Sequence, residues 1–156
     1  MLHRTTLICT ALLGILVLAA TAAAHADIAD SSSAHGAKAR LTVTIEHGCT
    51  AEGASVNAVD RVAIALPAAF GKPVPQTPNG WRAAVSRDGG AYRVVWSHTQ
   101  GKGFTGRLTL TAVNPAKAGT YAIPTVQYCG SASIAWIEKS VGGVEADHPV
   151  PTVSIR

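Results

Sequence analysis

Apolar and polar residues alternate along this sequence with a period of two, and each alternating run ends at Gly, Pro, Asn or Asp. Because successive side chains of a strand point to opposite faces of a sheet, such runs predict half-buried β-strands. No segment shows a convincing helical period. The predicted strands span residues 41–45, 61–66, 82–86, 92–96, 107–113, 121–128, 133–138 and 150–155. Short strands at this spacing predict an all-β domain, an antiparallel β-sandwich of the immunoglobulin or fibronectin-III type.

Turn residues refine this prediction. Residues 87–90 (Arg-Asp-Gly-Gly) separate two alternating runs and predict a β-hairpin. Pro124 interrupts the run 121–128, which predicts an edge strand or a bulge there because proline has no N–H to donate. The segment 71–80 contains three prolines and is predicted to be an extended loop.

The first 24 residues have the pattern of a secretory signal peptide. Arg4 precedes the apolar run 7–20, and small residues follow it. Small residues allow cleavage after Ala22, Ala24 or Ala26, and we expect cleavage after Ala24. Residues 25–156 would then form one exported domain, in the periplasm or outside the cell, without a membrane anchor.

Export also decides the cysteine chemistry. Cys9 leaves with the signal peptide, so the mature chain retains Cys49 and Cys129. In an oxidising compartment such a pair most simply forms a disulfide. The closed loop of about 80 residues predicts on the order of 4 kcal/mol of stabilisation. The alternative is that the two cysteines bind a metal ion.

Charge and motif patterns argue against several classes of function. Charged residues are 14% of the chain against 47% hydrophobic residues, and the basic residues are scattered rather than clustered. Nucleic-acid binding is therefore not expected. Ser97 and His98 are adjacent in a predicted strand and would point to opposite faces, which disfavours nucleophilic catalysis. We therefore expect a protein that is not an enzyme.

His25 stands out because cleavage after Ala24 would make it the first mature residue. Its α-amine and imidazole Nδ1 can then close a six-membered chelate ring on one metal ion. An α-amine has a pKa near 7.7–8.0, so it loses its proton to a metal at little cost. Nitrogen donors in tetragonal geometry suit Cu(II). The other mature histidines have no zinc-motif spacing; they are His35, His47, His98 and His148.

Several short motifs, in this order, resemble the YcnI-like copper-binding domain family of exported bacterial proteins. These motifs are Ala24-His25, His47-Gly48-Cys49, Val62 to Pro67, Lys72 to Pro75 with Gly80-Trp81, Val95 to Ser97, Ile123 to Cys129, Trp136 to Glu138 and His148 to Pro151.

The resemblance implies a β-sandwich that binds one Cu(II) per chain through a single-histidine brace. The brace would use the α-amine and imidazole of His25, with Trp136 nearby and a carboxylate ligand. Asp27 and Glu138 are the candidate carboxylates, since Asp27 is two residues from the brace and Glu138 two residues beyond Trp136. Residues 25–30, the expected N-terminal segment of the mature chain, lack the proline and glutamate that are frequent there in the family.

Three functions are compatible with these patterns. The first is copper trafficking or buffering, with delivery to a copper transporter or an oxidase-assembly protein. The second is a copper-dependent oxidative enzyme, which would need a second histidine such as His98 or His148. The third is an immunoglobulin-like interaction module without metal, which would use the proline-rich loop 71–80 as its contact surface.

Overall fold

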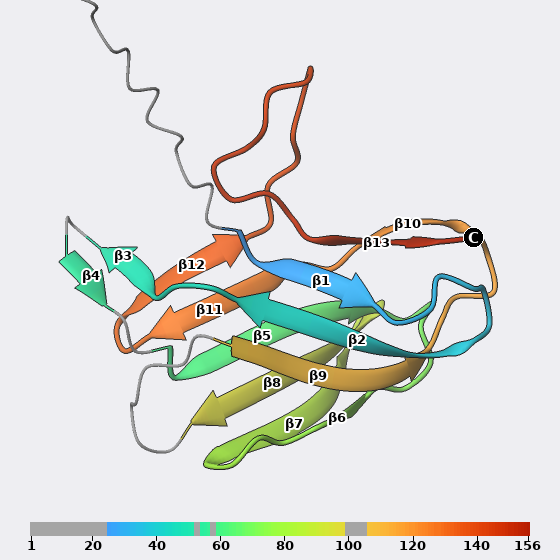
Figure 1. The fold of residues 1–156 in the computed structure, drawn as a ribbon, viewed down its shortest axis with the longest axis horizontal. Coiled ribbons are helices and arrows are strands. Elements are labelled where there is room, and N and C mark those ends of the chain that lie inside the picture. The colour runs from blue at the N-terminus through green and yellow to red at the C-terminus, as the bar shows by residue number, and fades with distance from the viewer. Residues whose placement is uncertain (1–24, 52–53, 57–58, 99–105) are drawn as a thin grey trace, which may run out of the picture.

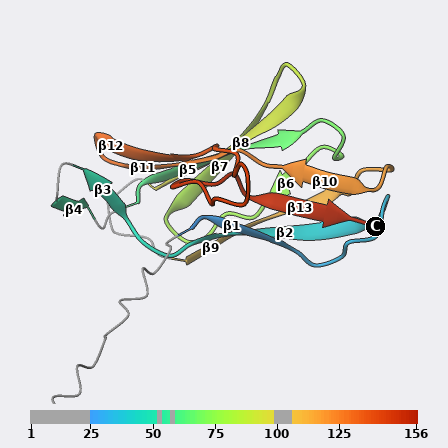
Figure 2. The same ribbon diagram turned by 90° about the horizontal axis from the view of Figure 1, so that it is seen from above.

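Two antiparallel sheets pack face to face in the computed structural model, which describes residues 25–51, 54–56, 59–98 and 106–156 (Figure 1). The predicted signal peptide, residues 1–24, lies outside the described residues. The first sheet has the strand order β12-β11-β5-β8-β7 and the second the order β1-β2-β9-β6. Figure 2 shows these two layers edge on. The predicted all-β, immunoglobulin-like sandwich with one disulfide is confirmed.

The strands of the five-stranded sheet are long in its centre and short at one edge. They are β5 (Arg61–Pro67), β7 (Trp81–Asp88), β8 (Ala91–His98), β11 (Thr125–Cys129) and β12 (Ala132–Trp136). The predicted hairpin is confirmed, since Asp88 pairs with Ala91 across a two-residue turn at Gly89 and Gly90. This turn matches the preference of two-residue hairpin loops for glycine.

The four-stranded sheet forms the other layer. Its strands are β1 (Asp27–Asp30), β2 (Lys38–Ile45), β6 (Val74–Pro75) and β9 (Gly106–Val113). Two small ribbons complete the fold: β3 (Cys49–Ala51) with β4 (Ala54–Val56), and β10 (Gly119–Ala122) with β13 (Thr152–Ile155).

Alternation of side chains explains how the core forms between the two layers. In β2 the side chains of Leu41, Val43 and Ile45 are buried, while Thr42 and Thr44 between them are half-buried. The neighbouring strand β9 and the strands β5, β8 and β12 of the other sheet contribute fully or nearly fully buried residues, which are Val62, Ile64, Leu66, Val94, Trp96, Leu108, Leu110, Ile134 and Trp136. Burial of this continuous apolar layer provides the main stabilisation of the fold.

The disulfide joins the start of β3 to the end of β11. Cys49 and Cys129 are 80 residues apart in sequence and their Cα atoms are 5.9 Å apart. Both cysteines are therefore bonded to each other, and the alternative that they bind a metal ion is wrong.

The prediction for residues 121–128 is wrong in one respect. The run is not a single strand but two, because β10 ends at Ala122 and β11 starts at Thr125. Pro124 lies in the break, and its carbonyl accepts the N–H of Ala65 at 2.9 Å. Since β11 lies between β12 and β5, it is an inner strand, and the proline marks a change of sheet rather than an edge or a bulge.

Candidate functional site

Trp136 lies at the end of β12 and contacts three histidines that are far apart in the sequence. Its ring centroid is 6.2 Å from that of His25, 6.0 Å from that of His47 and 5.1 Å from that of His148. All three pairs meet edge to face, with ring planes 72° to 77° apart. The fold thus gathers His25, the His-Gly-Cys segment and the loop before β13 around one indole.

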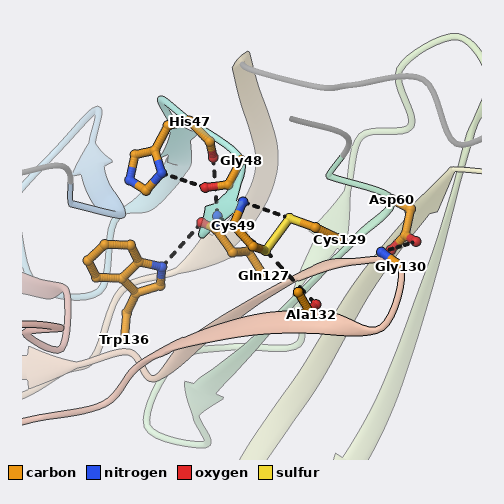
Figure 3. Close-up of a disulfide and its surroundings, with 9 residues drawn as sticks. All are labelled: His47, Gly48, Cys49, Asp60, Gln127, Cys129, Gly130, Ala132 and Trp136. Carbon is orange, nitrogen blue, oxygen red and sulfur yellow. Dashed lines mark hydrogen bonds between the residues drawn. A yellow bond between two sulfur atoms is a disulfide. The ribbon is translucent and has the colours of Figure 1, made fainter. Parts of the chain in front are cut away.

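A buried glutamine holds the indole in place. Trp136 Nε1 donates to Oε1 of Gln127 at 3.2 Å, and Nε2 of Gln127 donates to the carbonyl of His47 at 3.1 Å (Figure 3). The indole N–H is therefore already engaged. Trp136 can offer its ring to a neighbouring group, but its nitrogen is directed into the protein.

Two of the three imidazoles have a buried nitrogen without a partner. Nδ1 of His47 is 2.6 Å from the carbonyl of Gly48, which can only accept, so this nitrogen carries the proton. The opposite nitrogen, Nε2, is buried and has no hydrogen-bond partner among the described residues, and the same is true of Nδ1 of His148. Such unsatisfied atoms are uncommon in native proteins, and a functional role or a bound water or ion is among their explanations.

His25 lines a polar hollow of about 440 Å³ together with three carboxylate residues, Asp27, Glu46 and Glu145. Its side chain is 29% exposed, and its Nε2 is 3.6 Å from Oε1 of Glu145. β1 pairs with β2 so that Asp27 lies opposite Thr44. Continuing this register by two residues places Glu46 opposite His25, which brings a third carboxylate to the same hollow.

The predicted site residues are placed as follows. Asp27 lines the hollow of His25, and Trp136 contacts the imidazole. Glu138 lies beyond the end of β12 and lines a neighbouring hollow, where its Oε2 accepts the N–H of His148 at 3.4 Å. The structure thus brings His25, Asp27 and Trp136 together and places Glu138 beside His148 instead.

Sequence reasoning missed Glu46 and Glu145. Glu46 reaches His25 only through the pairing of β1 with β2, and β1 was not among the predicted strands. Glu145 reaches it through the long loop between β12 and β13. For Glu145, the one signal in the sequence was the nearby His148 before Pro149. In the structure, the contact of His148 with Trp136 marks the point where this loop returns to the site.

The other candidate for a second brace histidine lies elsewhere. His98, at the end of β8, packs edge to face on Trp81 with ring centroids 5.3 Å apart. It lines a separate hollow with Asp60 and Arg61. His35 is exposed in the turn before β2. Of the two candidates for a second brace histidine, His98 and His148, it is His148 whose ring contacts Trp136.

Within the described ranges, no three His, Cys, Asp or Glu side chains are arranged to hold a metal ion together. A site made of side chains alone, as in structural zinc centres, is thus not formed by these residues. A brace is different, because one of its nitrogens comes from the backbone α-amine of its first residue. The imidazole of His25 and the surrounding carboxylates provide nitrogen and oxygen donors of the kind that Cu(II) accepts.

No helix in the described part of the chain is long and apolar enough to span a membrane. A crystal structure of an uncharacterized protein from Nocardia farcinica, with an immunoglobulin-like fold, is similar to this chain with a TM-score of 0.70. That similarity covers 84% of this chain and 97% of the other at 20% sequence identity, and it shows the fold. A search of curated proteins gives no match. Residues 25–155 match the family described as a domain of unknown function, DUF1775, and the chain belongs to this family.

Proposed function

We propose that this protein is an exported copper-binding protein that holds one Cu(II) per chain at His25 and acts in copper trafficking or buffering. The first mature residue would be His25, after removal of residues 1–24 as a signal peptide. Its α-amine and Nδ1 would bind the ion as a single-histidine brace, as in the YcnI-like proteins that the sequence resembles.

One observation carries this proposal. His25, the residue at which the family match begins, lies half-exposed in a hollow with three carboxylates and against the indole of Trp136. Two nitrogens of His25 with one or two carboxylate oxygens make a tetragonal donor set, which is the set that Cu(II) favours. The buried ring of Trp136, which contacts the imidazole of His25, would limit the access of solvent to a bound ion.

Binding rather than catalysis is the economical interpretation of this site. The hollow contains one imidazole, whereas an oxidative copper enzyme with a full brace would need a second one. An ion bound at the exposed first residue of a chain can pass to a partner by exchange of ligands. A membrane copper transporter or an oxidase-assembly protein is the expected type of recipient.

The test uses protein that starts at His25, together with the variants His25→Ala and His35→Ala. His35 is the matched control, because it is an exposed histidine remote from the hollow. Cu(II) affinity and stoichiometry are measured by competition with a chromophoric chelator, and the nitrogen ligands are counted by electron paramagnetic resonance (EPR). We expect one tightly bound Cu(II) in the parent and in His35→Ala, and its loss in His25→Ala.

A third form tests the contribution of the backbone. Acetylation of the α-amine removes one nitrogen of the chelate while the imidazole remains, so the acetylated protein should also lose tight binding. Equal affinity in the parent, His25→Ala and acetylated forms would rule out the brace. The immunoglobulin-like interaction module without metal would then be the preferred function.

A further inference from the structure

We propose that Glu145 is a positioning residue for His25: its carboxylate accepts the Nε2 proton, which fixes the ring and leaves Nδ1 unprotonated, with a lone pair that a metal ion could take. This inference rests on the proposed function, because it concerns the imidazole of the same brace. It assigns Glu145 a role distinct from that of the carboxylates that would bind the ion directly.

The chemistry of the imidazole separates the two roles. In the six-membered chelate ring the metal binds Nδ1, which lies next to the side-chain attachment point. Nε2 points to the opposite side of the ring, away from that metal. Oε1 of Glu145 is 3.6 Å from Nε2 and thus faces the side of the ring that a brace leaves free. Metal-bound histidines commonly donate this second N–H to a carboxylate or carbonyl, which fixes the tautomer and orientation of the ring.

The loop that carries Glu145 is held at both ends. At its base, Glu138 donates its N–H to the carbonyl of His148 at 3.1 Å, and Val150 donates to the carbonyl of Glu138 at 2.8 Å. At its tip, Val141 and Val144 exchange backbone hydrogen bonds of 3.2 and 3.1 Å. Figure 1 shows this loop standing beside the start of β1.

A further contact orders the backbone beside Glu145 itself. The next residue, Ala146, donates its N–H to Oγ of Ser140 at 3.3 Å across the loop. The carboxylate is therefore presented to His25 from a loop with several internal hydrogen bonds, and the proposed contact requires the 3.6 Å separation to shorten to hydrogen-bond length.

The other two carboxylates of the hollow are placed for direct binding. Asp27, the first residue of β1, lies two residues after His25, and Glu46 lies opposite His25 when the register of β1 and β2 is continued by two residues. Neither has an ion pair with Nε2 among the described contacts. A contact between Glu145 and His25 adds little to stability, since the glutamate is 66% exposed and such pairs are screened by water. Loss of this contact should therefore change the tautomer and orientation of the His25 ring and leave the free energy of unfolding nearly unchanged.

The experiment compares Glu145→Ala, Glu145→Gln and the control Asp147→Asn, all starting at His25. Asp147 is an exposed carboxylate on the same loop. Without metal, at pH 9 where ordinary histidine is neutral, ¹⁵N NMR measures the Nε2–H tautomer fraction of His25 and its ring contact with Trp136. We expect both to fall in Glu145→Ala and to persist in Glu145→Gln, whose amide oxygen still accepts, and in Asp147→Asn.

With Cu(II), we expect Glu145→Ala to weaken binding about 10- to 100-fold and Glu145→Gln to weaken it less. The EPR spectrum should keep the same nitrogen count and the same oxygen ligand. Unchanged affinity and unchanged ¹⁵N spectra in Glu145→Ala would overturn the inference. So would a changed EPR spectrum in both Glu145 variants, which would make Glu145 a direct ligand. A tautomer change in a protein that binds no copper would contradict the proposed function and leave the positioning contact intact.

Discussion

Trp136 donates its indole N–H to Oε1 of Gln127 at 3.2 Å, and both side chains are only 1% exposed. The same glutamine donates to the backbone carbonyl of His47 at 3.1 Å. One amide therefore connects strand β12 to the segment that precedes the disulfide. Since Trp136 also contacts His25, the orientation of the indole beside the proposed copper site depends on a residue in the core.

Gln127→Leu should destabilise the protein by about 1–3 kcal/mol, because it leaves the N–H of Trp136 and the carbonyl of His47 unpaired in the interior. Urea unfolding followed by tryptophan fluorescence measures this loss. The control is Gln76→Leu, an exposed glutamine whose backbone carbonyl still accepts the N–H of Trp96. The two variants should differ clearly; an equal and small effect would mean that the buried network contributes nothing to stability.

Removal of the disulfide by Cys49→Ala together with Cys129→Ala should lower the free energy of unfolding by about 4 kcal/mol. The reason is that a crosslink over 80 residues restricts the unfolded chain. Equilibrium denaturation of the oxidised parent and of the double variant gives the difference. Adding reductant to the parent should reproduce it, and a difference below about 1 kcal/mol would contradict the entropic account.

Asn114→Ala should loosen the segment after β1. Nδ2 of Asn114 is 3.1 Å from Oδ2 of Asp30, 2.6 Å from the carbonyl of Ser32 and 3.1 Å from that of Ala34, and the residue is 2% exposed. Its loss removes a buried donor from these three acceptors, of which the carbonyl of Ala34 still accepts the N–H of Ala37 at 3.3 Å, so we expect about 1–3 kcal/mol of destabilisation. Hydrogen exchange should quicken in residues 27–34. Asn79→Ala, at an exposed position, is the control and should leave exchange there unchanged.

Gly80→Ala should cost more stability than Gly36→Ala. Both glycines have positive φ, +79° and +69°, so both alanines strain the backbone. A Cβ at Gly80 would also lie 2.8 Å from Nε2 of His98, whereas a Cβ at Gly36 meets no atom within 4 Å. Thermal unfolding of the two variants separates the shared backbone strain, about 1 kcal/mol, from the steric clash. Equal losses would show that His98 moves aside freely.

Most of the sandwich could be predicted from the alternation of residues, because that pattern reports directly which side chains are buried. Strands such as β5 and β9 lie close to their predicted ranges. β1 was missed, since its four residues, Asp-Ile-Ala-Asp, contain a single large apolar side chain. β6 was missed because two residues in a proline-rich segment show no period, and it pairs with β9 through the backbone.

The candidate site was predictable only where local chemistry defines it. The proposed chelation by His25 rests on its place after a cleavage motif, which can be read from the sequence alone, and it stays a prediction. Glu46 and Glu145 join His25 through strand register and through a loop that returns from 120 positions further along the chain. Neither neighbour of His25 can be predicted from the residues that surround His25 in the sequence. The engagement of the Trp136 nitrogen by Gln127 likewise depends on the pairing of β11 with β12.

The ladder of β1 begins at Asp27, so His25 lies outside the paired part of the sheet. An aminopeptidase that removes the first two mature residues would take away the chelating amine and imidazole and leave every strand in place. Circular dichroism and melting temperature would report an intact protein after such trimming. Under the proposed function, batches that look identical by these criteria would differ in metal content, and the mass of the N-terminal peptide would reveal the difference.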